Sequence, residues 1–253
     1  MPGMEKTQHI SLTTQVERGL KDKLSIGALR PGTRLITKNI AQALGISITP
    51  VREALLRLVS ANALAIAPAQ AFMVPDITMT RFSEIIHIRC ELEGMAVMTA
   101  TGEVTAERME ILQALLADYQ LAHESGTVED RLLANRALRF KIYQFANMPT
   151  LVEMIEQLWV RMGPSLHFLY DRAKHDAYQH NVGHYQELLN AMAAGNKDAS
   201  RHCLIDLINK NVAIIKQQYH IKSGLNIAGN IPASTIMNNR FYSKRQARLT
   251  PTP

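Results

Sequence analysis

Charged and amide side chains interrupt several apolar helical stripes in the second half of this sequence. Arg89 and Glu93 lie one helical turn apart among apolar residues, and Asn135 and Arg139 do the same further along the chain. Because a buried charge without a partner is costly, these groups should face one another or line a wet cavity. Guanidinium groups suit bidentate contact with carboxylates, so Arg89 and Arg139 together favour a bound small organic anion.

Two more polar residues share a face with apolar ones: His184 lies in line with Leu188, and Asp206 lies beside Leu207. The candidate anion-binding residues come from four predicted helices: Arg89, Glu93, Asn135, Arg139, His184 and Asp206. The alternative is that these groups form only structural ion pairs, such as Arg89 with Glu93, and bind nothing.

A metal-dependent enzyme is a competing interpretation, because His180 and His184 are spaced i, i+4 on one predicted helix. The pair lacks both the intervening Glu of the zincin arrangement and an evident third ligand. No phosphate-binding loop, nucleophile elbow or pair of catalytic carboxylates stands out either. Cys90 and Cys203 are the only cysteines and have no metal-type spacing, so neither a disulfide framework nor a cysteine zinc site is indicated. We therefore expect no catalytic activity.

A second group of polar residues lies on two short predicted helices near the N-terminus. The first helix covers residues 37–44 and ends at Gly45, and the second begins around Pro50. Apolar residues at 51, 54, 55, 58 and 59 recur at helical spacing, so one face is buried while Arg52 and Arg57 point outward. Two short helices joined by such a turn form a helix-turn-helix, whose second helix reads the DNA major groove. Strands predicted at 64–67 and 72–74 would add a β-wing. A helical hairpin that binds nothing is the alternative.

The strongest evidence against that alternative is a family resemblance. It is carried by three segments: Ile26-Gly27-x-Leu29-x-Pro31-Gly32-x-x-Leu35, Ile40-Ala41-x-x-Leu44-Gly45, and Ser47-x-Thr49-Pro50-Val51-Arg52-Glu53-Ala54-Leu55. With them, residues 11–75 resemble the winged helix of the GntR family of bacterial transcription regulators. The resemblance implies that the protein binds a double-stranded DNA operator. The residues it implies for this contact are Lys38, Ser47, Thr49, Arg52 and Gln70, with Arg34 and Arg57 as phosphate contacts.

The sequence departs from the family pattern at two places. Ile48 stands where an Arg usually follows the serine, and Ala71 replaces the frequent wing glycine. Base reading should therefore differ from that of relatives, with Ile48 packing on a thymine methyl group.

The second half resembles the helical effector domain of the FadR-type branch, often called FCD, through Ile88-Arg89-x-x-Leu92-Glu93, residues 143–151 and the run from His184 to Gly195. Metal-binding members of that branch hold a divalent ion with one Asp and three His residues, and the ion orients a carboxylate effector. The corresponding positions here are Asn135, Arg139, His184 and Asp206. Because Arg139 places a permanent cation where a ligand belongs, we expect no metal or other cofactor, and direct contact between the anion and the Arg residues.

The charge distribution agrees with a DNA partner for one part of the chain. The net charge is +6, but residues 1–75 hold nine Lys or Arg against four Asp or Glu, while residues 76–221 hold fourteen against eighteen. A protein that merely coats DNA nonspecifically is a further alternative, and the acidic middle argues against it. The sequence contains neither an apolar run long enough to span a membrane nor an N-terminal signal pattern, so we expect a cytoplasmic protein.

The expected fold is mainly α. We predict a flexible arm at 1–10, a winged helix-turn-helix at 11–75, a linker at 76–77, an antiparallel six-helix FCD-type bundle at 78–221, and a disordered basic tail at 222–253. The bundle helices should cover about 78–100, 105–124, 128–146, 150–173, 176–194 and 198–221, the fourth bent at Gly163-Pro164. One recognition helix reads too few base pairs for promoter specificity, so a homodimer on a pseudo-palindromic operator is expected. Residues 1–221 further resemble a regulator of enteric bacteria associated with exopolysaccharide and biofilm genes.

Overall fold

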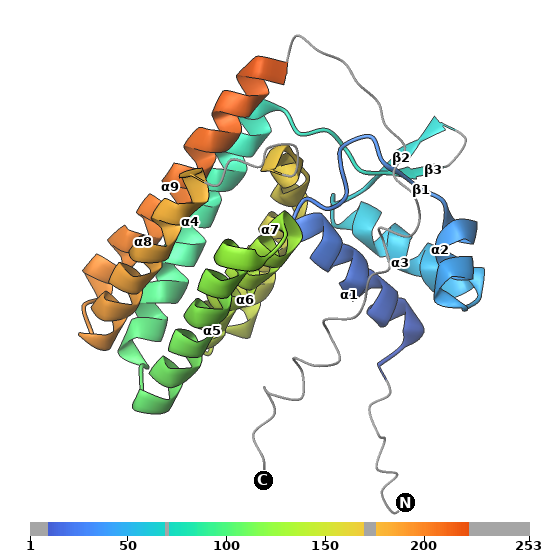
Figure 1. The fold of residues 1–253 in the computed structure, drawn as a ribbon. Coiled ribbons are helices and arrows are strands. Elements are labelled where there is room, and N and C mark those ends of the chain that lie inside the picture. Colours follow the sequence, from blue (N-terminus) through green and yellow to red (C-terminus); the bar gives the residue numbers. More distant parts are fainter. Residues whose placement is uncertain (1–9, 69–70, 170–175, 223–253) are drawn as a thin grey trace, which may run out of the picture. The chain divides into compact units, whose positions relative to one another are not determined.

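The computed structural model describes residues 10–68, 71–169 and 176–222 (Figure 1). For residues 168–169, 176–181 and 217–222 it describes the backbone alone. The predicted tail and most of the N-terminal arm lie outside the described residues. The chain forms two compact units. Of the described residues, the first unit comprises residues 10–23 together with Gly32–Pro75, and the second comprises Leu24–Pro31 together with residues 76–222. Each unit is described by itself.

The first unit is a helix-turn-helix with a small sheet. Its elements are α1 (Leu12–Ser25, whose last two residues belong to the second unit), β1 (Arg34–Leu35), α2 (Thr37–Leu44), α3 (Ile48–Ser60), β2 (Ala65–Ala67) and β3 (Ala71–Met73). Gly45 ends α2 in the left-handed conformation at φ 65° and its N–H turns back to the helix carbonyls, as its position between two helical patterns predicted. Val51, Ala54, Leu55 and Leu58 of α3 are fully buried, which confirms the predicted inward face.

The sheet contains one strand more than the sequence predicted. It is antiparallel in the order β1-β3-β2, with Leu35 opposite Phe72 on one side and Ile66 opposite Phe72 on the other. Strand β1 is only two residues long, which is too short for alternation of polar and apolar residues to show. Its buried Leu35 adds to the core of the unit.

The second unit is a helical bundle. Its elements are α4 (Met79–Gly102), α5 (Ala106–Ser125), α6 (Val128–Gln144), α7 (Pro149–Met162), the 3-10 helix η2 (Gly163–Leu169), α8 (Asp176–Ala193) and α9 (Lys197–Lys222). Helix α4 packs against α9, α7 and α6, while α8 packs against α9 and α5 (Figure 1). The predicted bend at Gly163-Pro164 is the place where α7 changes into η2. The mainly helical fold and the bundle are thus confirmed.

Threonine caps fix the starts of three bundle helices. The hydroxyls of Thr78, Thr105 and Thr127 each accept a hydrogen bond from the backbone N–H three residues later. Thr127 also donates its own N–H to Asp130 Oδ2 at 2.9 Å, which completes a capping box. These bonds satisfy N–H groups that a helix start leaves free, so they define where α4, α5 and α6 begin.

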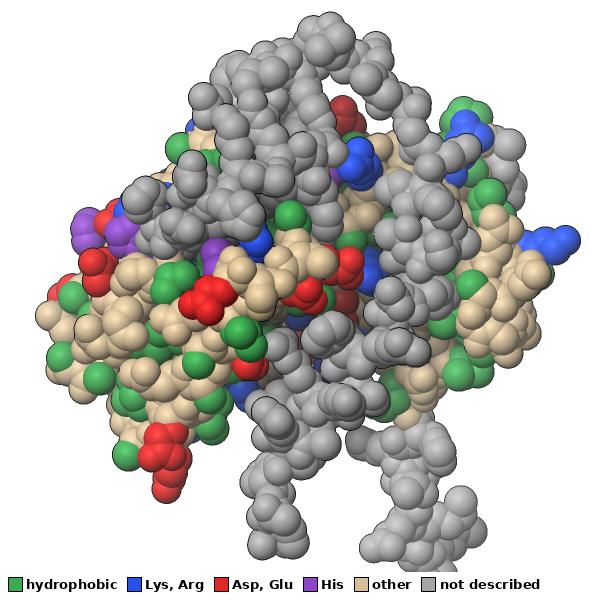
Figure 2. Space-filling view, viewed as in Figure 1, with side chains coloured by type: hydrophobic (Ala, Val, Ile, Leu, Met, Phe, Trp, Pro, Cys, Tyr) green, Lys and Arg blue, Asp and Glu red, His purple; other side chains and the backbone are tan. Residues whose placement is uncertain are grey.

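The surfaces of the two units differ in charge. On the face shown in Figure 2, Asp and Glu side chains gather over the bundle, whereas Lys and Arg side chains stand out on the helix-turn-helix unit. This distribution follows the sequence, in which basic residues exceed acidic ones before residue 76 and acidic residues exceed basic ones over 76–221. No described helix is long and apolar enough to cross a membrane.

Candidate functional site

The predicted DNA-contacting residues of the first unit lie on its surface. Ser47, Ile48, Thr49 and Arg52 are exposed around the first turns of α3. Ser47 is the N-cap residue of α3 by position, but its hydroxyl makes no capping hydrogen bond, so it remains available to a partner. The free N–H groups and positive dipole end of a helix favour a phosphate at this place.

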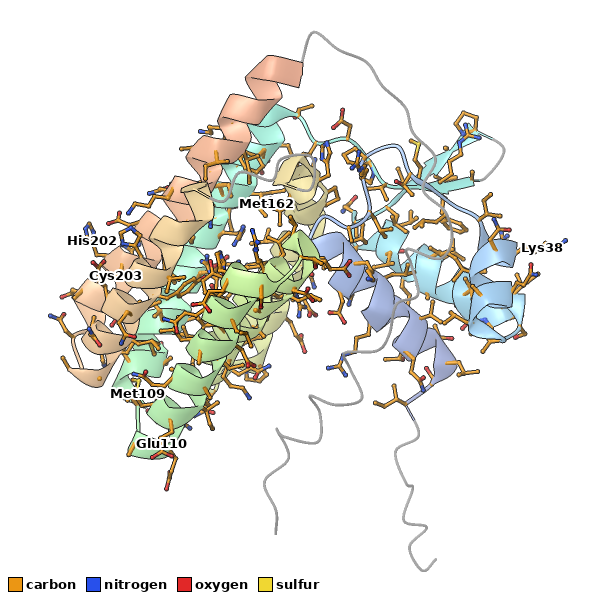
Figure 3. All side chains as sticks on the ribbon, in the orientation of Figure 1. Lys38, Met109, Glu110, Met162, His202 and Cys203 are labelled. Atoms are coloured by element: carbon orange, nitrogen blue, oxygen red, sulfur yellow. The ribbon has the colours of Figure 1, made fainter. Side chains whose placement is uncertain are left out.

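Two other predicted contacts lie on neighbouring elements. Arg34 in β1 and Lys38 in α2 are exposed, and Lys38 extends away from its helix (Figure 3). Gln70 lies outside the described residues. On the wing, the side chain of Ile66 is 55% exposed, a large apolar group that the sequence reading did not include. The structure thus brings cations and apolar side chains to the surface of one unit.

Helix α1 holds the recognition helix α3 at two points. The Thr13 hydroxyl donates to Glu53 Oε2 at 2.9 Å, and Arg57 Nη1 lies 3.3 Å from Glu17 Oε2. The Lys21 Nζ atom lies 2.8 Å from Glu17 Oε1. Burial acts to raise the pKa of the Glu17 carboxyl, but Lys21 and Arg57 outweigh it and hold that pKa below its ordinary value. Arg57, a predicted phosphate contact, is therefore already engaged by a carboxylate of its own unit.

In the second unit, the centre of the bundle holds a buried cluster around Glu93 of α4. The Glu93 carboxylate accepts hydrogen bonds from Arg89 Nε at 2.5 Å, Arg139 Nη2 at 2.7 Å and Trp159 Nε1 at 2.9 Å. The Tyr143 hydroxyl is a fourth donor. Arg89, Glu93 and Arg139 are at most 4% exposed, so this is a desolvated network built from α4, α6 and α7.

Aromatic groups complete the surroundings of the two guanidinium groups. The carbon centres of the Arg89 and Arg139 guanidinium groups lie 4.5 Å and 5.5 Å from the centroid of the Trp159 ring. Arg89 Nη1 also lies 2.8 Å from Met162 Sδ, and Arg139 Nε donates to the Tyr143 hydroxyl at 2.8 Å. A flat guanidinium stacked on an aromatic ring is held in one orientation, so both cations are fixed in place.

The protonation states of the cluster follow from its geometry. Burial acts to raise the pKa of the Glu93 carboxyl, but the charges of Arg89 and Arg139 outweigh it and hold that pKa below its ordinary value. Burial is the main reason why the pKa of the Tyr143 phenol lies well above its ordinary value, so the phenol stays neutral. Two guanidinium charges therefore face one carboxylate, and the cluster carries a net charge of about +1 at neutral pH.

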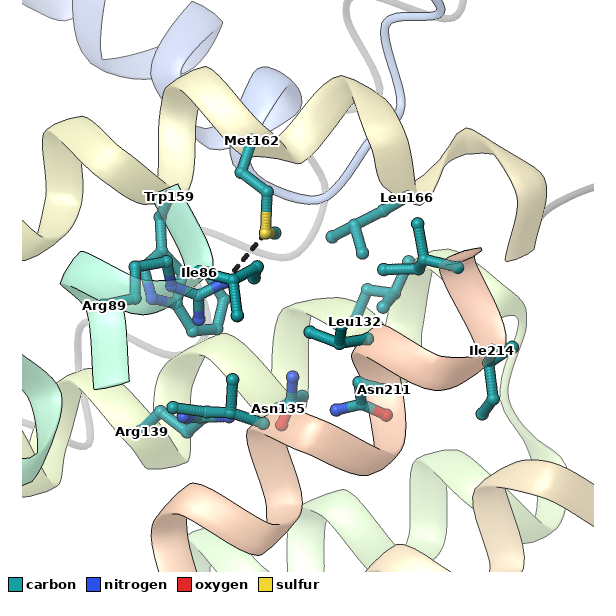
Figure 4. A pocket seen from close by; sticks show the side chains of 13 residues that line it. Ile86, Arg89, Leu132, Asn135, Arg139, Trp159, Met162, Leu166, Asn211 and Ile214 are labelled. Carbon is teal, nitrogen blue, oxygen red and sulfur yellow. Dashed lines mark hydrogen bonds between the residues drawn. The ribbon is translucent and has the colours of Figure 1, made fainter. Parts of the chain in front are cut away.

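A cavity of about 40 Å³ opens beside this cluster (Figure 4). The polar groups on its wall are Arg89, Asn135, Arg139, the indole of Trp159, and Asn211. Apolar side chains from α4, α6, η2 and α9 form the rest, with Met162 at the end of α7. Asn135 is oriented by the Tyr185 hydroxyl, which donates to its Oδ1. The volume suffices for roughly three water molecules or one small carboxylate.

Of the six predicted anion-binding residues, the structure brings four together and places two elsewhere. Arg89, Asn135 and Arg139 line the cavity, and Glu93 bridges the two Arg residues. His184 is not on the cavity wall: its Nδ1 lies 3.0 Å from Glu187, and its Nε2 contacts Lys210 on α9. Asp206 is half exposed and lies 3.3 Å from His202 Nε2.

Four polar or aromatic residues of the cavity and cluster were not predicted from the sequence, although only Trp159 lies on a helix without a predicted site residue. These are Tyr143, Trp159, Tyr185 and Asn211. Trp159 could have been suspected, because it is the only tryptophan and falls on the apolar face of α7. For the others, position depends on how one helix is rotated against its neighbours, which a single sequence does not reveal.

The described residues contain no cluster of three or more His, Cys, Asp or Glu side chains arranged to hold a metal ion. The positions that correspond to the metal ligands of relatives bring one guanidinium and one amide to the cavity. These groups fit an anion, since a guanidinium repels a cation and donates hydrogen bonds only.

Comparisons with known proteins show the family to which the chain belongs. The family described as "Bacterial regulatory proteins, gntR family" matches residues 12–74, and the FCD domain family matches residues 84–210. The chain is 53% identical over 220 residues to the HTH-type transcriptional regulator McbR of Escherichia coli strain K12, covering 87% of this chain and 100% of that protein. A second relative, the uncharacterized HTH-type transcriptional regulator YdhC of Bacillus subtilis, is 26% identical over 140 residues, covering 55% of this chain and 62% of that protein.

Solved structures give the same result for the fold. The structure of E. coli McbR/YncC matches with a TM-score of 0.81, covering 83% of this chain and 99% of that chain. A putative GntR regulator from Rhodococcus sp. RHA1, at 23% identity, matches with a TM-score of 0.67 over 81% of this chain and 97% of that one. With a GntR helix-turn-helix, an FCD bundle and a 53% identical relative, the chain belongs to the GntR family of bacterial transcription regulators, in the branch that carries an FCD domain.

Proposed function

We propose that this regulator acts in the cytoplasm as a homodimer that binds a pseudo-palindromic operator through α3. The residues near the bases are Lys38, Ser47, Thr49, Arg52 and Gln70. The residues near phosphates are Arg34 and Arg57. The observation that supports this best is the exposed start of α3. Polar, apolar and cationic side chains lie there on the surface and not in the core: Ser47, Ile48, Thr49 and Arg52. Bidentate Arg contacts and thymine-methyl contacts are the usual means of reading bases in the major groove.

In vitro selection of duplexes from a random library tests the DNA proposal. A symmetric consensus should emerge, and Arg52→Ala should weaken binding to it by about 1 to 3 kcal/mol at fixed salt. Arg81→Ala is the matched control, since Arg81 is an exposed arginine on α4 of the other unit and its removal should leave affinity unchanged. If all duplexes bound equally well, nonspecific coating of DNA would be the better interpretation.

We further propose that a small organic anion occupies the bundle cavity and changes operator affinity. The surplus charge of the cluster, with two guanidinium groups against one carboxylate, supports a monoanion, because its carboxylate would neutralise the site. The cavity volume of about 40 Å³ favours an acid of acetate size. Any effect on DNA affinity must be reciprocal, so operator DNA should change the affinity for the anion by the same factor.

Two neighbouring arginines on α6 allow a matched test of the anion site. Arg139 lines the cavity, whereas Arg136 pairs with Glu156 at 2.8 Å and is not on the cavity wall. Arg139→Ala leaves Arg89 and Glu93 as a neutral pair, so thermal stabilisation by acetate and similar acids should be lost, together with any effector response. Arg136→Ala should retain both. An anion response that survives Arg139→Ala would remove the cavity from the proposal.

The metal-free form of the proposal has its own test. Elemental analysis of purified protein should show no stoichiometric zinc, nickel or manganese. Stoichiometric metal that is lost in His184→Ala would contradict it. Genome-wide mapping of bound sites would show whether exopolysaccharide and biofilm genes are among the targets, as the narrower sequence resemblance leads us to propose.

A further inference from the structure

The two arginines on the wall of the bundle cavity have hydrogen-bond partners of different strength. Arg139 donates from Nε to the Tyr143 hydroxyl and from Nη2 to Glu93 Oε2, so two of its nitrogen atoms have oxygen acceptors. Arg89 donates only from Nε to an oxygen, Glu93 Oε1. Its Nη1 donates to Met162 Sδ at 2.8 Å, and no oxygen of the described residues accepts from either Nη atom of Arg89. The Nη edge of Arg89 is therefore the part of the cluster with the weakest partner.

The Met162 sulfur is a poor partner for a permanent cation. A thioether is a weak and neutral acceptor, whereas a hydrogen bond from a guanidinium to a carboxylate is short and among the strongest in proteins. The contact is also buried, because Arg89 is 4% and Met162 3% exposed, so bulk water does not make up for the weak acceptor. An oxygen with negative charge at this place would bind the Arg89 edge more strongly than the sulfur does.

The sulfur lies where a ligand in the cavity would meet Arg89. Both residues are on the cavity wall, and Figure 4 shows the Met162 side chain reaching from its helix to the Arg89 guanidinium. Methionine is unbranched and rotates about three side-chain bonds, so the sulfur can leave the guanidinium without movement of the backbone. A ligand oxygen that approaches Nη1 from the cavity therefore competes with the sulfur for the same donor.

We propose that Met162 is a specificity-determining residue of the anion site: its sulfur holds the place of one carboxylate oxygen on Arg89 Nη1, and the effector binds by replacing it. The inference rests on the proposed binding of a small organic anion in the cavity. It assigns the carboxylate to the Nη edge of Arg89, whereas Arg139 contributes its charge. A neutral molecule of the same size gains little when it replaces one neutral acceptor by another, so the sulfur makes the site selective for charge.

Two substitutions change the acceptor at this place in opposite directions. Met162→Leu keeps an apolar side chain of similar volume but removes the acceptor, whereas Met162→Gln provides an amide oxygen, which is a stronger acceptor than the sulfur. Met192→Leu is the matched control, because Met192 is fully buried on α8 and is not on the cavity wall. The affinity of each full-length protein for acetate, and for the neutral acetamide of the same size, is measured by titration calorimetry.

Without the competing sulfur, Met162→Leu should bind acetate roughly 2- to 10-fold more tightly than the wild type, which is the effect of one net hydrogen bond. Met162→Gln should bind acetate more weakly than the wild type, and Met192→Leu should bind it equally well. The wild type should bind acetamide more weakly than acetate.

Thermal unfolding separates this effect from a packing defect. Ligand-free Met162→Leu should unfold at a lower temperature than the wild type, because Arg89 loses an acceptor, and saturating acetate should reduce the difference. A packing defect would lower the unfolding temperature of both states alike and leave the acetate affinity unchanged.

An acetate affinity that is unchanged or weaker in Met162→Leu would overturn the inference. If Met162→Leu does not fold, Met162→Gln decides, and acetate binding by Met162→Gln that equals or exceeds that of the wild type would overturn it as well. Acetate that binds neither the wild type nor Met162→Leu would remove the proposed anion site and this inference with it. Failure of the inference alone has a different signature: the wild type binds acetate, Arg139→Ala does not, and Met162→Leu binds it no more tightly than the wild type.

Discussion

Replacement of Glu93 by Gln tests whether the buried cluster is electrostatic in origin. The side chain keeps its size and one acceptor oxygen, but the other oxygen becomes an NH₂ group that faces donors. In the wild type, Glu93 Oε2 accepts from Arg139 Nη2 at 2.7 Å and from the Tyr143 hydroxyl, and Oε1 accepts from Arg89 Nε and Trp159 Nε1. Glu93→Gln therefore leaves two guanidinium charges in the core with no carboxylate beside them.

The expected loss is large because the charged side chains of the cluster are buried. Removing one partner of a buried ion pair costs about 3 to 5 kcal/mol, and we expect about 3 kcal/mol because Gln preserves the packing and one acceptor. Glu91→Gln is the control on the same helix: Glu91 pairs with Arg201 at 2.9 Å, but its side chain is 63% exposed, so less than about 1 kcal/mol is expected.

Urea unfolding measured by tryptophan fluorescence is the appropriate assay, because Trp159 is the only tryptophan and donates to Glu93 itself. The signal then reports the unfolding of the bundle and not that of the winged helix. A loss below about 1 kcal/mol for Glu93→Gln, or an equal loss for Glu91→Gln, would refute the reasoning. Acetate should stabilise Glu93→Gln more than the wild type, since it can supply the missing negative charge.

The difference in the free energy of unfolding between wild type and Glu93→Gln should depend on pH with a defined sign. The folded-state pKa of Glu93 is lowered from 4.5, so its contribution is complete above that value and is lost as the pH falls through the folded pKa. The free energy of unfolding of wild type should therefore exceed that of Glu93→Gln by a constant amount between about pH 7 and 5. This excess should decrease only in stronger acid. A difference that already narrows between those two pH values would contradict the assignment.

Three further predictions concern other elements. Glu17→Gln should raise operator affinity at low salt and steepen the logarithmic salt dependence by up to about 0.9, because it releases Arg57 for a phosphate; an unchanged slope would show that Arg57 stays away from DNA. Thr127→Ala should lower the free energy of unfolding of the bundle by about 1 kcal/mol in urea, because it removes the capping box of α6; no loss would mean that Asp130 alone holds the helix start. Replacing thymine by uracil at the contacted base should weaken operator binding by the wild type by about 0.8 kcal/mol. The same replacement should leave operator binding by Ile48→Ala unchanged. Equal effects on both proteins would exclude a methyl contact by Ile48.

Most of the fold could be predicted because its helices are long and their apolar residues recur regularly. The left-handed stop at Gly45, the threonine before α5 and the break at Gly163-Pro164 are local signals, and each one appears in the structure where the sequence indicates it. Strand β1 could not be predicted, because two residues carry no period.

The meeting of Arg89 and Glu93 with Asn135 and Arg139 was predicted, but the pairing of individual atoms was predictable only within a helix. Arg89 and Glu93 are i, i+4 neighbours, so their pairing follows from the sequence itself. The position of His184 depends on rotation: Leu188 and Leu189 are both fully buried, so the inward face of α8 is wide, and Tyr185 rather than His184 occupies its centre. Tyr143 and Trp159 reach Glu93 from helices whose mutual register one sequence does not specify.

The division of α1 between two units bears on how this protein can be cut into working fragments. A cut after Pro75 separates the family segments neatly in sequence, yet it removes Leu24–Pro31 from the bundle to which these residues belong by contact. Ile26 and Leu29, now 1% exposed, would then face water in the N-terminal fragment, and Leu132 would lose its contacts with Ile26 and Ala28 in the other. An isolated winged helix should therefore be prone to aggregation. An isolated bundle should gain solubility and stability when residues 24–31 are supplied as a separate peptide.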